Sequence, residues 1–442
     1  MDRPGLRRYL AGAAVARAGD EMSGPALLLL GFAVTGRPET GSGLLASLTI
    51  AGAAGGPLFG ALLDRSRRPD RLLAWTLVAY ALGIAAVQAA VGRLPMPALA
   101  AIALFAGLFN PAVTGGWTAQ LPRVVTGREL DRGSALDALT FSAASLAGPA
   151  LAAGVAAGIG ARAAVLTAAA LVVLAVPSAC SLSRYRPSAV DAGQRRVALR
   201  RQMAAGFAVI AARRPLLRAT VTSVVSYAGI GMLLVCCPLL GAQRLGDPAR
   251  GALLISAIAV ASLTANVILA RRPGAPRRRR PGIQRRRRPG IQCRRRPGYP
   301  RPDTWVFAST LVIGVSMAAA ALAPGWLTLT AVALSGAGEG PQLTALFAVR
   351  HRETPANLRG QVYTTAASLK IAGLAAGAAL AGPLAGWSVT GCLLIAAGTQ
   401  LCAAAAYLAA GFTRPAQREP AAAPPPGRAG TDAETVRPVR SG

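Results

Sequence analysis

Twelve apolar stretches follow one another along this 442-residue chain, each roughly 20 residues or slightly longer. An α-helix rises 1.5 Å per residue, so about 20 residues cross the roughly 30 Å hydrocarbon core of a bilayer. Ala, Leu, Val and Gly dominate, without the alternation of a transmembrane β-barrel. The sequence therefore predicts an all-α integral membrane protein with about 12 transmembrane helices. The stretches are 10–34, 43–63, 72–92, 96–120, 134–158, 161–183, 216–241, 250–270, 304–323, 326–349, 360–384 and 387–411.

The basic residues are segregated between the two sides of this predicted bundle. The net charge of +31 would indicate a polyanion partner in a soluble protein, but 53% of the residues are hydrophobic and only 15% are charged. Most of the 48 Lys and Arg residues lie in the two tails and in alternate loops, and short loops rich in Lys and Arg stay cytoplasmic. We therefore expect a multi-pass plasma-membrane protein with both termini in the cytoplasm. The opposite side carries only Arg37, Arg93, Arg162, Arg244 and Arg250.

The chain divides into two halves of six stretches each. We expect a first six-helix bundle over 1–183, a basic cytoplasmic linker over 184–215 and a second six-helix bundle over 216–412. The linker has an Arg-rich part whose apolar positions fit an amphipathic helix on the membrane surface. Arg-Gly leads into both the fifth and the eleventh stretch, and AASL recurs at 143–146 and 366–369, which favours two pseudo-symmetric bundles. Residues 271–303 form an Arg-rich loop and 413–442 a tail, and we expect both to be disordered in the cytoplasm.

No pattern in the sequence indicates an enzyme or a protein-bound metal. The six cysteines include no C-x-x-C pair, His351 is the only histidine, and no Gly-rich phosphate loop is present. We therefore expect no catalytic residues, no metal site and no cofactor.

The most specific motif is GALLDRSRRPDR at 60–71, after the second stretch. Gly60, Leu62, Asp64, Arg65 and Arg68 follow the spacing G-x-L-x-D-R-x-x-R, which resembles the gating loop of the major facilitator superfamily of transporters. Glycine allows helices to approach closely, the carboxylate can cap or pair with a neighbouring helix end, and the arginines keep the loop cytoplasmic. An ordinary basic loop would explain only the arginines.

Further segments resemble bacterial drug-efflux members of this family. Gly148 and Pro149 match the fifth-helix motif of drug:proton antiporters, although Ala144 replaces its first glycine and Ala152-Ala153 its final pair. The second-half copy of the loop motif, expected between the eighth and ninth stretches, is unrecognisable. The resemblance implies two halves that rock around a midplane site, with Gly148-Pro149 and Gly382-Pro383 as deformable or closely packed points.

Five charged residues inside the stretches are candidates for coupling, because charge in the hydrocarbon core is costly and faces the bundle interior. Arg17, Asp20 and Glu21 share one helix face, about 16 Å deep for Asp20. Glu339 and Lys370, the only lysine, fall near the same depth, and we expect an ion pair or a shared polar site between them. The alternative is structural: each base neutralises an acid and locks two helices. One arginine cannot neutralise both Asp20 and Glu21, which leaves a candidate proton carrier.

Other polar residues in the stretches are candidate contacts with substrate, or helix-to-helix hydrogen bonds. They are Asn110, Trp117, Gln120, Tyr227, Asn266 and Gln342.

Three functions remain open at this point. The first is proton-coupled efflux of drug-like or antibiotic-like molecules by alternating access, with a small molecule and membrane lipids as partners and a monomer as the working unit. The second is an uptake permease of the same fold. The third is a membrane scaffold or a binder of nucleic acid or anionic lipid, acting through the Arg-rich loop.

The Arg-rich loop argues against specific nucleic-acid binding. Residues 277–284 and 285–292 are identical octets, RRRRPGIQ, with only Tyr299 as an aromatic neighbour. Pro-Gly breaks both helix and strand, so the repeat predicts a disordered loop that contacts anionic headgroups at about 1 kcal/mol per arginine. A transport assay after deletion of 277–300 separates the third function from the first two.

Overall fold

The computed structural model describes residues 4–125, 129–182, 199–247, 250–271 and 302–409, and every regular element in these ranges is helical. The Arg-rich repeat, most of the linker before residue 199 and the tail after residue 409 lie outside the described residues. The first half contains α1 (Pro4–Thr35), α2 (Pro38–Arg65), α3 (Pro69–Ala90), α4 (Met96–Gly107), η1 (Ala112–Gly116), α5 (Leu121–Val124), α6 (Glu129–Gly158), α7 (Ala161–Leu174) and α8 (Val176–Ser181). After α9 (Leu199–Ala212), the second half contains α10 (Arg214–Leu245), α11 (Gly251–Arg271), α12 (Pro302–Leu322), α13 (Leu327–Glu353), η5 (Ala356–Leu358), α14 (Arg359–Trp387) and α15 (Val389–Ala409).

Ten helical segments of the described chain are long and apolar enough to cross a membrane, judged by length and composition. Two of them join shorter helices: Met96–Gly116 contains α4 and η1, and Ala161–Ser181 contains α7 and α8. The long helices α1 and α13 fall outside this set, and they carry three and one of the charged residues singled out above. Together with them, the segments follow the order of the twelve predicted stretches.

Local sequence sets several of the helix ends. Pro38 and Pro69 occupy the first turn of α2 and α3, where the missing N–H of proline costs no hydrogen bond. Gly246 ends α10 in the left-handed region with φ of 78°, which glycine adopts without steric cost. These proline and glycine residues set the helix ends, and short turns at those ends lead the chain back across the bundle.

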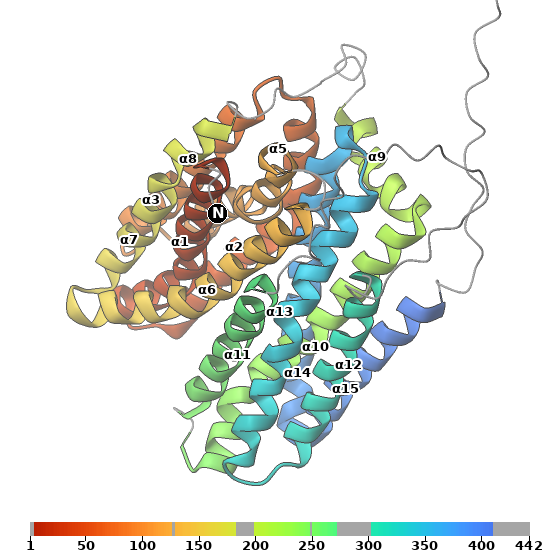
Figure 1. Ribbon diagram of the computed structural model, residues 1–442. Helices are drawn as coiled ribbons and strands as arrows, with labels where there is room; N and C mark the ends of the chain where they lie inside the picture. The colour runs from red at the N-terminus through yellow and green to blue at the C-terminus, as the bar shows by residue number, and fades with distance from the viewer. Residues whose placement is uncertain (1–3, 126–128, 183–198, 248–249, 272–301, 410–442) are drawn as a thin grey trace, which may run out of the picture.

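The helices form two bundles that correspond to the two halves of the chain. In Figure 1 the red-to-yellow helices α1 to α8 lie on one side, and the green-to-blue helices α10 to α15 lie on the other. Within the first half α1 packs on α2, α6 and α7, and within the second half α10 packs on α14 and α15. Each half has an apolar core, and the core of the first half extends to Leu343, Phe347 and Tyr363 of the second half.

The halves contact each other mainly through two helix pairs, α2 with α14 and α6 with α11. On α2, the Gly52 carbonyl accepts a hydrogen bond from Ser368 (2.7 Å) and the Gly56 carbonyl accepts one from Thr364 (2.6 Å). On α6, the Ser142 hydroxyl lies 2.9 Å from that of Ser262. We call the end where α2 stops and α14 starts the basic end, because residues 65–71 of the loop motif lie there and include four arginines.

These cross-half hydrogen bonds lie in the part of α2 and α6 that is nearer the basic end. The opposite ends of the two bundles diverge in Figure 1. The halves are therefore closed against each other at the basic end. The midplane residues of α1 and α14 lie on the side of this closure that faces away from the basic end.

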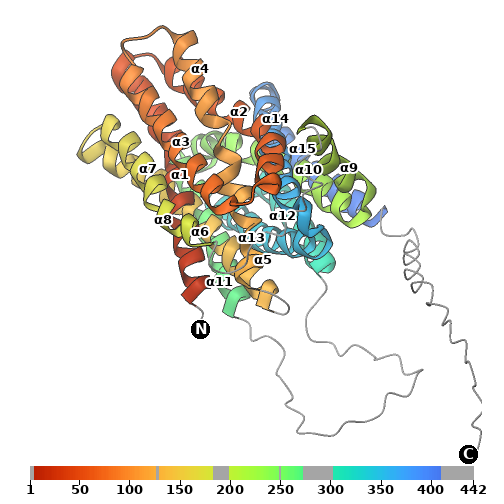
Figure 2. The same ribbon diagram turned by 90° about the horizontal axis from the view of Figure 1, so that it is seen from above.

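Helix α9 adds to the closure. It contacts α2 of the first half and α10 and α14 of the second, and Gly206 lies directly against the side chain of Gln361. Phe207 on its other face remains exposed. The sequence predicts the amphipathic character of this helix, but not that it crosses the junction between the two halves. Figure 2 shows α9 beside α10.

Candidate functional site

A buried ion pair joins α1 to α6 in the first half. The Arg17 Nη1 atom lies 2.9 Å from Asp137 Oδ1, and the two side chains are 1% and 0% exposed. Asp137 also accepts hydrogen bonds from Tyr9 (2.8 Å) and Thr118 (2.8 Å). Arg17 further donates to Thr118 and Thr140, and its guanidinium carbon lies 3.6 Å from the centre of the Phe141 ring. The charge of Arg17 is therefore neutralised within one half.

Sequence reasoning missed Asp137 as a partner. A signal was present, because Asp137 is an acidic residue inside the fifth apolar stretch, where charge is costly. The alternative that Arg17 pairs with Asp20 or Glu21 does not describe this structure. Among the described residues, no ion pair within 4 Å holds either of those carboxylates.

Asp20 is held by neutral hydrogen-bond donors from two other helical segments. Its Oδ1 atom accepts from the Tyr80 hydroxyl of α3 at 2.7 Å and from the Asn110 amide at 2.6 Å. Tyr80 in turn lies 2.8 Å from the hydroxyl of Ser23. This carboxylate is only half-buried, and its second oxygen can accept a proton without breaking either bond.

Glu21 points toward α6. It accepts a hydrogen bond from Ser145 at 3.3 Å, and its backbone packs against Gly148, where an added Cβ would lie 2.6 Å from the Cβ of Glu21. Gly148 therefore allows α6 to approach α1 at the carboxylate, and α6 runs on through Pro149 without a break. Gly382, its proposed counterpart in α14, has open space where a Cβ would stand.

Glu339 and Lys370 share a polar site in the second half, and a tyrosine contacts both of them. Tyr227 of α10 donates a hydrogen bond to Glu339 at 3.0 Å, and the Lys370 ammonium lies 4.4 Å from the centre of the Tyr227 ring. The structure forms no ion pair within 4 Å between Glu339 and Lys370, both of which it describes. Of the two forms expected from the sequence, the geometry is that of a shared polar site.

Lys370 also reaches across to the first half. Its ammonium lies 5.6 Å from the centre of the Phe141 ring on α6, the same ring that Arg17 contacts. Glu339 and Glu21 both lie within electrostatic range of Lys370. The charged residues of both halves therefore meet in one region, and Asp20, Glu21, Glu339 and Lys370 are each half-buried there.

An aromatic series closes this region on the side of the basic end. Phe141 packs against Phe347 with ring centres 5.6 Å apart, and Phe347 lies 6.3 Å from Tyr363. Tyr363 packs against His351 at 4.8 Å. Phe141 belongs to the first half and the other three residues to the second. The series therefore crosses the junction between Lys370 and the basic end.

The loop motif forms the outer part of the same closure. The Asp64 carboxylate accepts hydrogen bonds from the backbone N–H groups of Gly360 (2.7 Å) and Gln361 (2.8 Å), which are free at the start of α14. A Cβ on Gly60 would collide with the Thr364 side chain and the Gln361 backbone. Asp64 thus caps a helix of the opposite half, and Gly60 provides the close approach.

The other members of the motif lie on the surface or at helix ends of the first half. Leu62 is exposed on α2, and Arg68 provides the N-cap position of α3 while its N–H bonds to Ser66. Arg65 is the last residue of α2.

The six candidate cavity residues divide into three groups. Asn110 and Tyr227 contact the carboxylates, as described above. Asn266 lies at the junction of the halves, where it donates to Ser142 at 2.8 Å. The remaining three are buried within one half and bond to it: Trp117 packs on Tyr9, Gln120 bonds to its own helix segment, and Gln342 bonds to Thr310.

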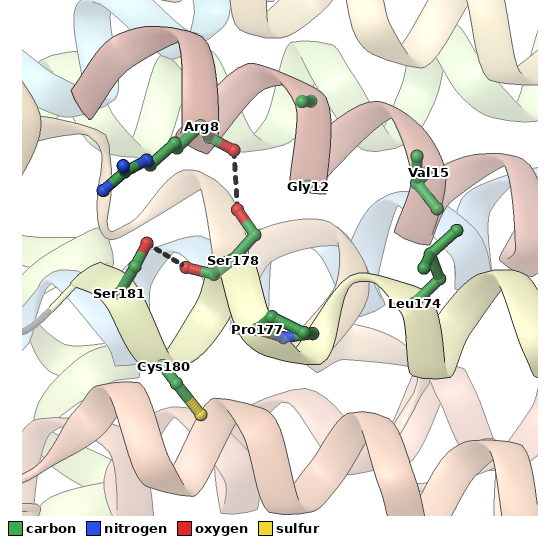
Figure 3. A pocket seen from close by; sticks show the side chains of 9 residues that line it. Arg8, Gly12, Val15, Leu174, Pro177, Ser178, Cys180 and Ser181 are labelled. Atoms are coloured by element: carbon green, nitrogen blue, oxygen red, sulfur yellow. Dashed lines mark hydrogen bonds between the residues drawn. The ribbon is translucent and has the colours of Figure 1, made fainter. Parts of the chain in front are cut away.

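A surface pocket lies apart from this site. Figure 3 shows it between α1 and α8, where the Ser178 hydroxyl donates to the Arg8 carbonyl and the Ser181 hydroxyl to the Ser178 carbonyl. None of the carboxylates described above lines it. Among the described residues, no group of three His, Cys, Asp or Glu side chains is placed to hold a metal ion.

Comparison with known proteins agrees with this architecture. The sequence model of the Major Facilitator Superfamily matches residues 9–289. The uncharacterised MFS-type transporter y4rN of Sinorhizobium fredii is 27% identical over 411 residues, which cover 92% of this chain and 94% of that protein.

Solved structures share the fold at low sequence identity. A bacterial homologue of the iron transporter ferroportin, in an outward-facing state, matches with a TM-score of 0.70 at 15% identity, covering 92% of this chain and 100% of that one. The human organic anion transporter MFSD10 matches with a TM-score of 0.66 at 15% identity over 91% and 99% of the two chains. The Escherichia coli fucose:proton symporter FucP matches with a TM-score of 0.65 at 13% identity over 92% and 98%. The chain belongs to the major facilitator superfamily, whose members are membrane transporters rather than enzymes and work by alternating access.

Proposed function

We propose that this transporter exports small amphiphilic, drug-like molecules in exchange for protons. The observation that carries the proposal is the pairing of Arg17 with Asp137, which leaves Asp20 and Glu21 without a basic partner within 4 Å. Unpaired carboxylates at membrane depth are costly when charged, and taking up a proton removes that cost. Asp20 and Glu21 are therefore the proposed proton carriers.

The proposed cycle uses the closure at the basic end. We place the basic end in the cytoplasm, because loops rich in arginine stay on that side. The state described here then faces outward, and Asp20 or Glu21 binds a proton after the substrate has left. The halves next open at the basic end, which requires release of the Asp64 cap on α14 and separation of Phe141 from Phe347. The proton leaves to the cytoplasm as the next substrate binds.

Export is favoured over uptake by the resemblance of the chain to bacterial efflux members and by the small number of unbonded hydrogen-bond donors beside the carboxylates. The site offers few hydrogen-bond donors that would select a polar nutrient: Tyr80, Asn110 and Ser145 are already bonded to the carboxylates.

Direction is tested in a bacterial strain that lacks its own efflux pumps. We expect expression of the wild type to lower cellular accumulation of a panel of amphiphilic antibiotics and dyes, and expression of the Asp20→Asn, Glu21→Gln double variant to have no effect. Higher accumulation in cells that express the wild type would show uptake and contradict the proposal.

A further inference from the structure

The ammonium group of Lys370 occupies a cage with the features of an organic-cation site. One wall is the Tyr227 ring, 4.4 Å from the ammonium, and the other is the Phe141 ring, 5.6 Å away on the opposite half. Ammonium groups are attracted to the faces of aromatic rings within about 6 Å of the ring centre, and aromatic cages recognise quaternary ammonium ligands in the same way.

The acids around this cage are not neutralised by Lys370. Glu339 and Glu21 lie on opposite halves and within electrostatic range of the ammonium, yet neither forms an ion pair within 4 Å with it. The Glu339 carboxylate instead accepts from the Tyr227 hydroxyl, and that of Glu21 accepts from Ser145. Both carboxylates are thus held in place by neutral donors, whether or not a cation is present.

The charges of the region favour one additional cation. The basic groups are Arg17, Lys370 and Arg350, and the two arginines also lie within electrostatic range of Lys370 and repel it. Arg17 is paired with Asp137. Asp20 lies within electrostatic range of Glu21 and Arg17. With Asp20 included, the four carboxylates of the region outnumber its three basic groups by one when all are ionised. A single monovalent cation therefore balances the region.

We propose that Lys370 is a tethered occupant of a site for a monovalent organic cation, and that the transported molecule displaces it from between Tyr227 and Phe141. The displaced ammonium moves away from the two rings, and the substrate cation takes its place between Glu21 and Glu339. The inference names the substrate class of the proposed exporter and in that respect rests on the proposed function. Binding at the cage, however, requires neither proton coupling nor a direction of transport.

A pair of probes of nearly the same shape and opposite charge tests the inference. Purified full-length protein in detergent is equilibrated by dialysis with tetraphenylphosphonium, a lipophilic cation, or with tetraphenylborate, its anionic counterpart. We expect the wild type to bind the cation more tightly than the anion. Removal of the tethered charge in Lys370→Met should tighten binding of the cation by about tenfold or more, because the cage is then open.

Two further variants and a control make the result specific. Glu339→Gln and Tyr227→Leu should each weaken cation binding by about tenfold, through loss of the carboxylate charge and of the ring. Arg93→Met removes one positive charge from an exposed residue after α3 and should leave binding unchanged. If Lys370→Met does not fold, Lys370→Gln replaces it, and the wild-type comparison of the two probes stands without either variant.

Several results would overturn the inference. They are preferred or equal binding of tetraphenylborate, no binding of either ion, and loss of binding in the Lys370 variants, which would make Lys370 an anion-binding group. Tight cation binding with the expected response to the variants, but with no coupled proton movement, would contradict the proposed function. It would still support the inference that the cage binds an organic cation.

Discussion

Replacement of Asp137 by asparagine is the perturbation whose energetic consequence follows most directly from the structure. The substitution preserves side-chain size but removes the charge that neutralises Arg17. The arginine is 1% exposed, so water cannot replace the lost partner. Breaking a buried ion pair from one side costs about 3–5 kcal/mol, because the remaining charge is left uncompensated in a medium of low polarity.

Substitution of the other partner, Arg17, is expected to lower the free energy of unfolding by less. In Arg17→Met the Asp137 carboxylate keeps its hydrogen bonds from Tyr9 and Thr118. We therefore expect Arg17→Met to lower the free energy of unfolding by about 1–3 kcal/mol. The double variant removes both charges together, so its cost should fall below the sum of the single costs by about 2 kcal/mol or more.

Unfolding in mixed micelles of mild detergent and dodecyl sulfate measures these free energies. The exposed pair Arg37 and Glu39, with atoms 4.0 Å apart, provides a matched control cycle in which the coupling should stay below about 1 kcal/mol. Costs of Arg17→Met and Asp137→Asn that add to within about 0.5 kcal/mol would refute the claim that these residues form one neutral buried unit.

Three further predictions concern the closure at the basic end. Asp64→Asn should weaken the cap on α14 and make the closed state less populated, seen as faster alkylation of a cysteine introduced at Phe141 in a background without native cysteines. Gly60→Val should do the same by steric collision with α14, whereas Leu62→Val on the exposed face of α2 should not. In that background, Ser142→Cys with Ser262→Cys should form a disulfide under oxidation and stop transport until it is reduced, and continued transport by the oxidised protein would contradict alternating access at this junction.

The general architecture could be predicted from the sequence because its determinants are local. Helix length and apolar composition fix the spans, and the order of the stretches matches the described helices, including α1 and α13 despite their internal charges. The spacing of Gly60 and Asp64 also predicts a contact between helices, and both residues lie on the face of α2 that meets α14.

The partners of individual charges could not be predicted, because they depend on how each helix is rotated against its neighbours. Arg17 shares a helix face with Asp20 and Glu21 in sequence, but its long side chain reaches Asp137 on α6 instead. The position of each residue along α13 and α14 predicts that Glu339 and Lys370 lie at a similar depth, but it does not show that Tyr227 of α10 contacts both of them. Contacts between helices far apart in sequence leave no periodic signal in a single chain.

The central claim is that Asp20 and Glu21 carry the protons that drive transport. Its most direct test is substrate-dependent proton movement in proteoliposomes, with the wild type compared with the Asp20→Asn, Glu21→Gln double variant. We predict that substrate added to wild-type proteoliposomes moves protons in the opposite direction, and that the double variant moves no protons even at substrate concentrations raised to offset weaker binding through loss of the Glu21 charge. Unchanged proton movement in the double variant would contradict the account.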